Sequence, residues 1–262
     1  MPPMSTGGTY HSLSLPRRWI CDLVALSKTI PIAALEHRLN LKPLIEARNA
    51  LESPPSWVVL FLKAFAIVAK ERKALRQFFV GFPWPRIYEH PVNVAAITVE
   101  RDYKGEPSTF FDMLLTPEVM SFEELHEHLR KLKHDPVEVS RTFKLMIQTA
   151  RFPLPIRRMV WRWLYSFSGP RRAHYMGTFA INGGGRYPIR PVTIIGAVGT
   201  TLYFGLFDAD GSTDVCLTFD HRVMDGGEVI RSLLDLEVVM NTVLVEELKA
   251  LAPSTAATER VH

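Results

Sequence analysis

Residues 213–231, TDVCLTFDHRVMDGGEVIR, constrain the fold more than any other stretch of the chain. Apolar and polar side chains alternate as far as Asp220, which is the period of a strand with two different faces. An Asp-Gly-Gly turn signal follows, and the apolar residues after it recur at helical spacing. The sequence therefore predicts that His221 ends a strand, with the Asp225 carboxylate four residues further on at the start of a helix.

Helical and strand patterns alternate along the rest of the chain, and we expect one large domain. With 262 residues, 47% of them hydrophobic, the chain is long enough to bury a sizeable core. The predicted helices cover residues 17–26, 42–51, 56–79, 121–133 and 156–167, and the predicted strands cover residues 32–41, 92–100, 177–182, 192–198, 201–207 and the segment that ends at His221. The domain would span residues 15–250, between a flexible arm (1–14) and a flexible tail (251–262).

Several classes of protein are disfavoured. The two cysteines, Cys21 and Cys216, lie far apart among apolar residues, so we expect buried, reduced thiols in a cytoplasmic protein. The N-terminus does not resemble a signal peptide, and the most apolar run is too short to span a membrane. Three histidines lie in or beside the predicted helix 121–133 without a cysteine or an HExxH spacing, so we predict no metal site.

The charge is unevenly distributed. Residues 139–207 contain ten of the 31 basic residues and no acidic residue, whereas the rest of the chain has 21 basic and 27 acidic residues. Such a block indicates an anionic partner, either a phosphorylated ligand or an anionic membrane surface. Within it, residues 141–172 combine arginines with aromatic side chains, and the helix at 156–167 suits either a lipid interface or a core helix whose arginines pair elsewhere. No nucleic-acid reader motif accompanies the block.

The chemistry is most readily argued from His221. Histidine exchanges a proton near neutral pH, and a carboxylate four residues away across a turn could orient the ring or organise the backbone around it. The chain has no serine or cysteine in a GxSxG nucleophile elbow. We therefore favour direct transfer, in which the histidine deprotonates an external nucleophile, over a covalent enzyme intermediate.

The segment TFDHRVMDGG resembles the active-site motif of the dihydrolipoyl acyltransferases of 2-oxo acid dehydrogenase complexes. These enzymes are a branch of the coenzyme A-dependent acyltransferases that also includes chloramphenicol acetyltransferase. Weaker similarities support the motif and extend the resemblance over about residues 15–245: Arg17-Arg18, Ser27-Lys28-Thr29-Ile30-Pro31, Leu62-Lys63-Ala64, Val92-Asn93-Val94 and Gly177-Thr178-Phe179-Ala180-Ile181-Asn182.

The resemblance implies an α/β fold, an α+β sandwich in which a chloramphenicol acetyltransferase-like mixed β-sheet is flanked by helices. It also implies a homotrimer, or a larger cage, with each active site between neighbouring subunits. His221 would be the general base, and Asp225 would be mainly structural, paired with Arg17 or Arg18. Coenzyme A would enter a channel from one side and the second substrate from the other, with Thr178, Arg17 and Arg18 as candidate binding residues.

Two departures from the family pattern shape the functional hypothesis. Asn182 stands where the family places the serine that stabilises the oxyanion, although an amide N–H can also donate to an oxyanion. The lipoyl domain is missing from this chain, as are the subunit-binding domain and the Pro/Ala-rich linkers. We expect a stand-alone acyltransferase that uses acyl-coenzyme A or acyl carrier protein and a thiol, hydroxyl or amine acceptor. The alternatives are an inactive trimeric scaffold and a binding module for coenzyme A-like ligands.

Overall fold

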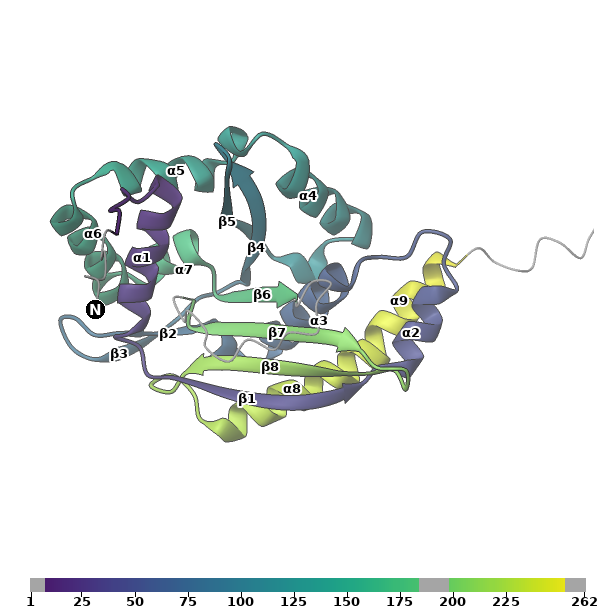
Figure 1. The fold of residues 1–262 in the computed structure, drawn as a ribbon. Helices are drawn as coiled ribbons and strands as arrows, with labels where there is room; N and C mark the ends of the chain where they lie inside the picture. The colour runs from purple at the N-terminus through teal and green to yellow at the C-terminus, as the bar shows by residue number, and fades with distance from the viewer. Residues whose placement is uncertain (1–7, 184–197, 253–262) are drawn as a thin grey trace, which may run out of the picture.

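The computed structural model describes residues 8–183 and 198–252, and Figure 1 shows a mixed sheet with helices packed on one face and around one end. The helices are α1 (Leu15–Ser27), α2 (Lys42–Asn49), α3 (Trp57–Glu71), α4 (Phe122–His134), α5 (Arg141–Arg151), α6 (Leu154–Phe167), α7 (Gly169–Met176), α8 (Gly226–Asn241) and α9 (Val243–Leu251). The strands are β1 (Ile32–Asn40), β2 (Gln77–Val80), β3 (Arg86–Glu89), β4 (Val94–Tyr103), β5 (Glu106–Leu115), β6 (Phe179–Gly183), β7 (Thr200–Phe207) and β8 (Ser212–Asp220).

The main sheet has the strand order β1-β8-β7-β6-β4-β5. Strand β6 runs parallel to both of its neighbours, β4 and β7, whereas the other neighbouring pairs are antiparallel. Strands β2 and β3 form a separate antiparallel pair. The mixed sheet flanked by helices that the sequence predicted is confirmed.

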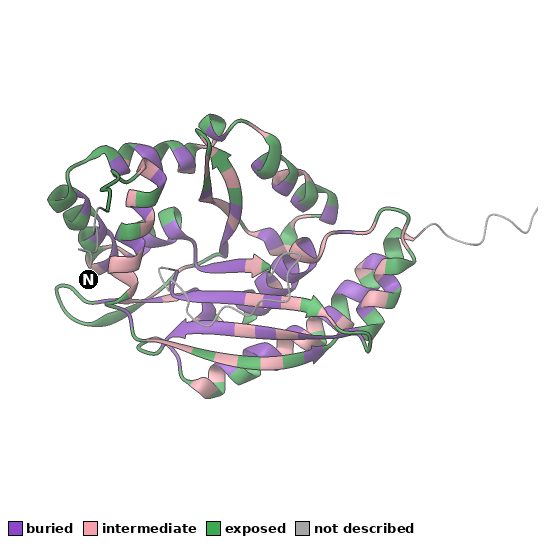
Figure 2. Ribbon diagram, viewed as in Figure 1, coloured by how far each residue is buried: buried purple, intermediate pink, exposed green. Residues whose placement is uncertain are grey.

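Helices α3 and α8 cover one face of the strands β1, β8, β7 and β6, while no described helix lies on the opposite face (Figure 1). The alternation in β8 explains this arrangement, because its odd-numbered residues Val215, Leu217 and Phe219 are buried beneath the helices. On the same side, the Phe61 ring of α3 stacks on Phe204 of β7 with 4.1 Å between ring centroids. Figure 2 shows this buried layer along the strands and on the inner sides of the helices.

A second group of helices, α1, α5, α6 and α7, gathers beside the hairpin of β4 and β5 (Figure 1). Helix α6 buries Arg157, whose Nε lies 2.7 Å from an oxygen of the buried Asp22 in α1. The apolar side that we expected to lie either at a lipid interface or in the core is exposed at Ile156, Trp163 and Phe167, and the helix buries Trp161, Leu164 and Tyr165. The interpretation in which an arginine pairs within the fold is therefore correct for Arg157.

Two predictions of local structure were wrong. The helix predicted over 56–79 ends at Glu71, and the segment beyond it forms a 3-10 turn and then β2. The helix ends because Arg72 adopts an extended backbone conformation, and the Arg72 side chain pairs with Glu228 and Asp235 of α8. Strand β5 was not predicted, although it pairs with β4 along its whole length.

The prediction that both cysteines are buried was wrong. Both cysteines are free, Cys216 is partly buried, and Cys21 is exposed because it lies on the solvent side of α1. No helix among the described residues combines the length and apolar character needed to cross a membrane. The predicted strand 192–198 falls almost wholly outside the described residues, as do the first half of the N-terminal arm and nearly all of the C-terminal tail.

Candidate functional site

His221 follows the last residue of β8 and begins the turn that leads into α8. Its backbone N–H donates to the Pro31 carbonyl at 3.0 Å, which ties the turn to the start of β1. The amide N–H groups of Val223 and Met224 donate to the Asp220 carbonyl, closing the turn on itself. The His221 side chain is 53% exposed, so a fixed backbone presents the imidazole to solvent.

The two residues on either side of His221 form a buried clamp. Arg222 donates to both carboxylate oxygens of Asp220, from Nε at 2.9 Å and from a terminal nitrogen at 2.7 Å. The Arg222 backbone N–H adds a third bond to Asp220 at 3.0 Å. The Asp220 side chain is 1% exposed and the Arg222 side chain 30% exposed, so a buried carboxylate and a partly solvated guanidinium hold the histidine between two fixed neighbours.

A second arginine lies behind the clamp. Arg172 of α7 is fully buried between the rings of Phe78 and Tyr165, with its guanidinium carbon 4.6 and 4.5 Å from the two ring centroids. Burial lowers the pKa of Arg172 from its ordinary value, while Tyr165 and Asp220 act in the opposite direction. Asp220 therefore compensates positive charge from two arginines at the base of the His221 turn.

Asp225 is the residue before α8, and its side chain is 90% exposed. Its nearest described charged partner is His221, with 3.6 Å between the carboxylate oxygen and Nδ1. The expected pairing with Arg17 or Arg18 is not formed within the chain. Arg17 lies 3.9 Å from Glu106, and Arg18 donates to a backbone carbonyl in the N-terminal segment, because α1 leads away from the turn toward β5.

Asn182 lies on the open face of the sheet. The register places Asn182 of β6 beside Tyr203 of β7, and Tyr203 beside Cys216 of β8, so these side chains form one row across three strands. The Asn182 side chain hydrogen-bonds with the Tyr203 hydroxyl, and burial raises the pKa of that hydroxyl, which keeps it protonated. The row thus offers an amide and a phenol as neutral hydrogen-bond donors.

The structure does not bring Asn182 and His221 together within one chain. Asn182 is level with Cys216, and His221 is five residues further along the same strand direction. At about 3.3 Å per residue, the two positions are roughly 16 Å apart along the sheet. A single copy of the chain cannot place both side chains on one reacting group.

Thr178 is buried and makes structural bonds. Its hydroxyl accepts from the Val94 N–H at 3.0 Å and lies 3.2 Å from the Val94 carbonyl oxygen. The preceding Gly177 has φ +79°, and a Cβ there would meet the Val94 carbonyl at 2.8 Å. Together they fix the start of β6 against β4, close to Asn182.

Sequence reasoning missed Tyr203, Arg172 and the clamp around His221. The Asp220–Arg222 pair had a signal, since two opposite charges flank the histidine in the motif itself. Tyr203 and Arg172 had none, because they reach the site through strand register and helix packing. Among the described residues, no group of three or more histidine, cysteine or acidic side chains is arranged to hold a metal ion.

Comparison with known proteins bears on the fold. The chain matches no protein-family model, and no curated protein sequence matches it. Among solved structures, it is similar to a probable dihydrolipoamide acetyltransferase from Listeria monocytogenes, with a TM-score of 0.63 and 17% identity over 98% of this chain and 99% of that one. It is also similar to the dihydrolipoamide acetyltransferase of Azotobacter vinelandii, with a TM-score of 0.64 and 14% identity over 93% of this chain and 97% of that one.

A third similar structure is a truncated catalytic core of the 2-oxoacid dehydrogenase multienzyme complex from Thermoplasma acidophilum, with a TM-score of 0.62 and 14% identity over 90% of this chain and 99% of that one. At these identities the likeness shows that the chain has the fold of these catalytic cores. The predicted resemblance is therefore confirmed at the level of the fold.

Proposed function

We propose that the protein is an acyltransferase that moves an acyl group between a coenzyme A or acyl carrier protein thioester and a thiol, hydroxyl or amine acceptor. The observation that carries the proposal is His221, an exposed imidazole held on a rigid turn by a buried aspartate–arginine clamp. The solved structures with the same fold include acetyltransferases, which supports this class of reaction.

In the proposed reaction, a nitrogen of His221 removes the proton from the acceptor. The Nδ1 atom faces Asp225 at 3.6 Å, which leaves Nε2 for the proton transfer. The acceptor atom attacks the thioester carbonyl carbon, the resulting oxyanion collapses, and the C–S bond breaks. The departing thiolate then takes the proton from the imidazolium, so that the histidine returns to its starting state. Asn182 and Tyr203 are the proposed donors to the oxyanion.

This chemistry requires a second copy of the chain. We propose a homotrimer in which His221 of one copy faces Asn182 of its neighbour. Within one chain the two residues lie too far apart to act together, and one face of the sheet has no described helix over it. A closed ring of three copies repeats one head-to-tail interface and would build three such sites. A larger assembly is compatible with this arrangement, since one structure of similar fold is the cubic core of a pyruvate dehydrogenase complex.

Subunit complementation tests the shared site. His221→Ala and Asn182→Ala copies are each expected to be inactive alone. Unfolded together in equal amounts and refolded, they should regain about a quarter of the wild-type activity, because a quarter of the interfaces in randomly mixed rings combine the two intact residues. Mixtures that stay as inactive as their components would contradict a site built from two copies.

Thiol release from acyl-coenzyme A tests the enzymatic activity itself. His221→Ala should reduce turnover by about a hundred- to ten-thousand-fold while leaving the melting temperature near that of the wild type. His126→Ala, an exposed histidine on α4, is the matched control and should keep full activity. Full activity in His221→Ala would refute the assignment of the base.

The basic segment supports a further part of the proposal, contact with an anionic surface. Arg158 and Arg162 are exposed on α6 beside exposed apolar side chains, as in helices that lie at a lipid interface. Replacing both by glutamine should reduce co-sedimentation with anionic liposomes. Arg157 is unsuitable for this test because its 2.7 Å pairing with the buried Asp22 is structural, whereas Arg158 is 56% exposed and approaches Asp22 only at 3.9 Å. Equal sedimentation of the variant would remove the membrane from the proposal.

Asn182 also motivates a second candidate, a scaffold that has kept the fold without the reaction. An asparagine side chain already bonded to Tyr203 is less free to meet an oxyanion than a serine hydroxyl. Under this alternative, acyl-coenzyme A would not be consumed by the purified protein. Thermal stabilisation by coenzyme A without turnover would favour a binding module over both.

A further inference from the structure

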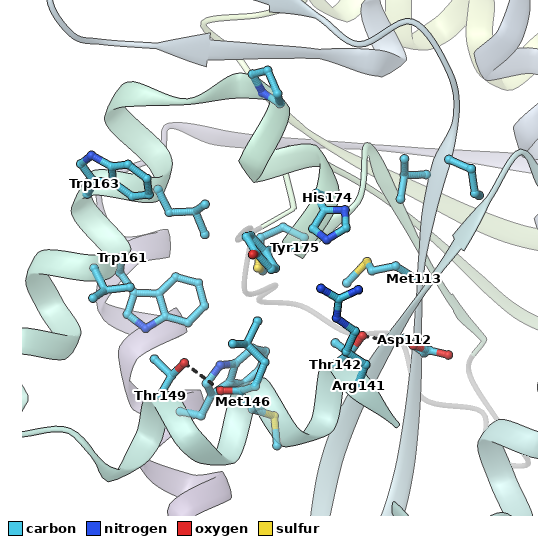
Figure 3. Close-up of a pocket in the computed structure, with 18 of the residues that line it drawn as sticks. Asp112, Met113, Arg141, Thr142, Met146, Thr149, Trp161, Trp163, His174 and Tyr175 are labelled. Atoms are coloured by element: carbon cyan, nitrogen blue, oxygen red, sulfur yellow. Dashed lines mark hydrogen bonds between the residues drawn. The ribbon is translucent and has the colours of Figure 1, made fainter. Parts of the chain in front are cut away.

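A hollow of about 780 Å³ lies beside α5, α6 and α7, and neither His221 nor Asn182 lines it. Its lining comes from β4 and β5, from Trp19 of α1 and His90 before β4, and from the three helices. Figure 3 shows the labelled residues of the lining. The volume falls within the range of small-molecule sites in proteins, roughly 300–1,000 Å³. The proposed acyl transfer does not use this space.

The body of the hollow is apolar and aromatic. Trp161, Trp163, Met113 and Met146 line it, and the Trp161 ring is braced edge-on against Trp19 at 5.8 Å between centroids. Methionines and aromatic rings of this kind accommodate flexible apolar groups of varied shape. The walls therefore suit a hydrocarbon chain or a ring system.

The polar groups of the hollow are mostly donors. Arg141 makes no ion pair with any described residue, and in Figure 3 its guanidinium points toward the same part of the hollow as His174. Among the described lining residues the one acidic side chain is Asp112, which already accepts a bond from Thr142 at 3.2 Å and lies 3.3 Å from His128. Arg141 is thus left with uncompensated positive charge at the rim.

The Trp161 indole adds a second indication of a missing ligand atom. Trp161 is 7% exposed, and its Nε1–H has no hydrogen-bond partner in the described part of the chain. A buried indole N–H ordinarily finds an acceptor, because leaving a donor without one costs free energy. An oxygen of a bound molecule would satisfy it.

We propose that this hollow binds an amphipathic anion, a molecule with one apolar chain or ring body and one carboxylate or phosphate head. The head lies at Arg141 and His174, the body lies along Trp163 and the methionines, and an oxygen substituent carried on the body meets the Trp161 N–H. The absence of acidic residues from 139 to 207 favours an anion over a cation or a neutral ligand. This site is separate from the proposed catalytic turn and does not depend on it.

Isothermal titration of the full chain with three probes, each below its micelle concentration, tests the proposal. Decanoate and decyl phosphate share a chain and differ in the head, and decan-1-ol has the chain without a charge. Saturable binding of at least one anion, at least tenfold tighter than the alcohol, is expected. Arg141→Gln should weaken the anion by about 10- to 100-fold and leave the alcohol unchanged, as loss of a charge-assisted hydrogen bond predicts.

Two matched pairs of variants control the test. Lys144→Gln removes an exposed charge from the same helix outside the hollow and should bind like the wild type. Thr149→Trp fills the lined space and should abolish binding, whereas Gln148→Trp adds the same bulk outside it and should not. Circular dichroism and melting curves establish that each variant is folded.

Three results would overturn the proposal. The first is absence of saturable binding of both anions to the wild type. The second is an equal loss in Arg141→Gln and Lys144→Gln, which would indicate adsorption to surface charge. The third is loss of anion binding in His221→Ala, which would place the ligand at the turn. Retained binding in that variant together with loss of acyl transfer supports the pocket independently of the proposed enzyme activity.

Discussion

Arg222→Met is the sharpest test of how the His221 turn is held. Methionine keeps an unbranched apolar stem where the Arg222 guanidinium now lies 4.3 Å from the centre of the Phe79 ring, so packing changes little. The substitution removes both side-chain bonds to Asp220 and leaves that carboxylate, at 1% exposure, with the Arg222 backbone N–H as its bonded donor among the described residues and Arg172 as the remaining positive charge nearby. A buried charge that loses its partner typically costs about 3–5 kcal/mol of unfolding free energy.

Asp220→Asn should destabilise the protein for a different reason. The Arg222 side chain is 30% exposed, so water can solvate it when Asp220 is replaced by asparagine. The fully buried Arg172, however, then loses the carboxylate that opposes its positive charge, so the cost of this variant comes mainly from Arg172. The costs of the two single variants should not add in the double variant, because the two residues are in direct contact.

Urea unfolding followed by circular dichroism, at one protein concentration for all variants, measures these differences. Arg231→Met is the matched control, since Arg231 makes a 2.7 Å pair with Glu228 at 59% exposure and should contribute about 0–1 kcal/mol. If Arg222→Met lowers the unfolding free energy no more than Arg231→Met does, the pair of Arg222 with the buried Asp220 is not what holds the turn.

Two further predictions concern pH and capping. Burial, and to a smaller extent the charge of Arg76, lowers the pKa of His90 in the folded protein. As the pH falls below about 6.5 the unfolded chain therefore binds the proton first, and the unfolding free energy declines. His90→Gln should reduce the difference in unfolding free energy between pH 7 and pH 5 measured with urea, and an unchanged difference would contradict this reasoning. Ser121 caps α4 reciprocally with Glu124, so Ser121→Ala should cost about 1 kcal/mol, and a loss under a few tenths would show that packing alone fixes this helix end.

The sequence was informative where local chemistry decides the structure. The alternation before His221 and the Asp-Gly-Gly signal after it predicted β8, the turn and α8, because a strand period and a turn need only neighbouring residues. The capping box at Ser121 predicted the start of α4 for the same reason. His221 itself was recognisable as a candidate base from its place in this motif.

Tertiary contacts decided what the sequence could not show. The apolar residues after Glu71 continue a helical pattern, yet Arg72 leaves the helix to pair with α8, more than 150 residues away in sequence. Similarly, Tyr203 joins Asn182 only because β6 and β7 pair in parallel at that register. Neither partner is marked by the residues that precede or follow it.

Helix α6 shows how one long-range ion pair can help to decide the orientation of a helix. Its sequence suits either a lipid interface along the side that contains Ile156, Trp163 and Phe167 or a core helix whose arginines pair elsewhere. Asp22 changes the balance, because its carboxylate is buried in α1 and would be unpaired without an arginine 2.7 Å away. Arg157 therefore turns inward, also donating to the Ala150 carbonyl, and the apolar side turns outward. Trp163 is thereby placed in the lining of the hollow, with the Arg171 guanidinium 4.3 Å from its ring centroid, so the same ion pair that orients the helix also gives the proposed ligand site its aromatic wall.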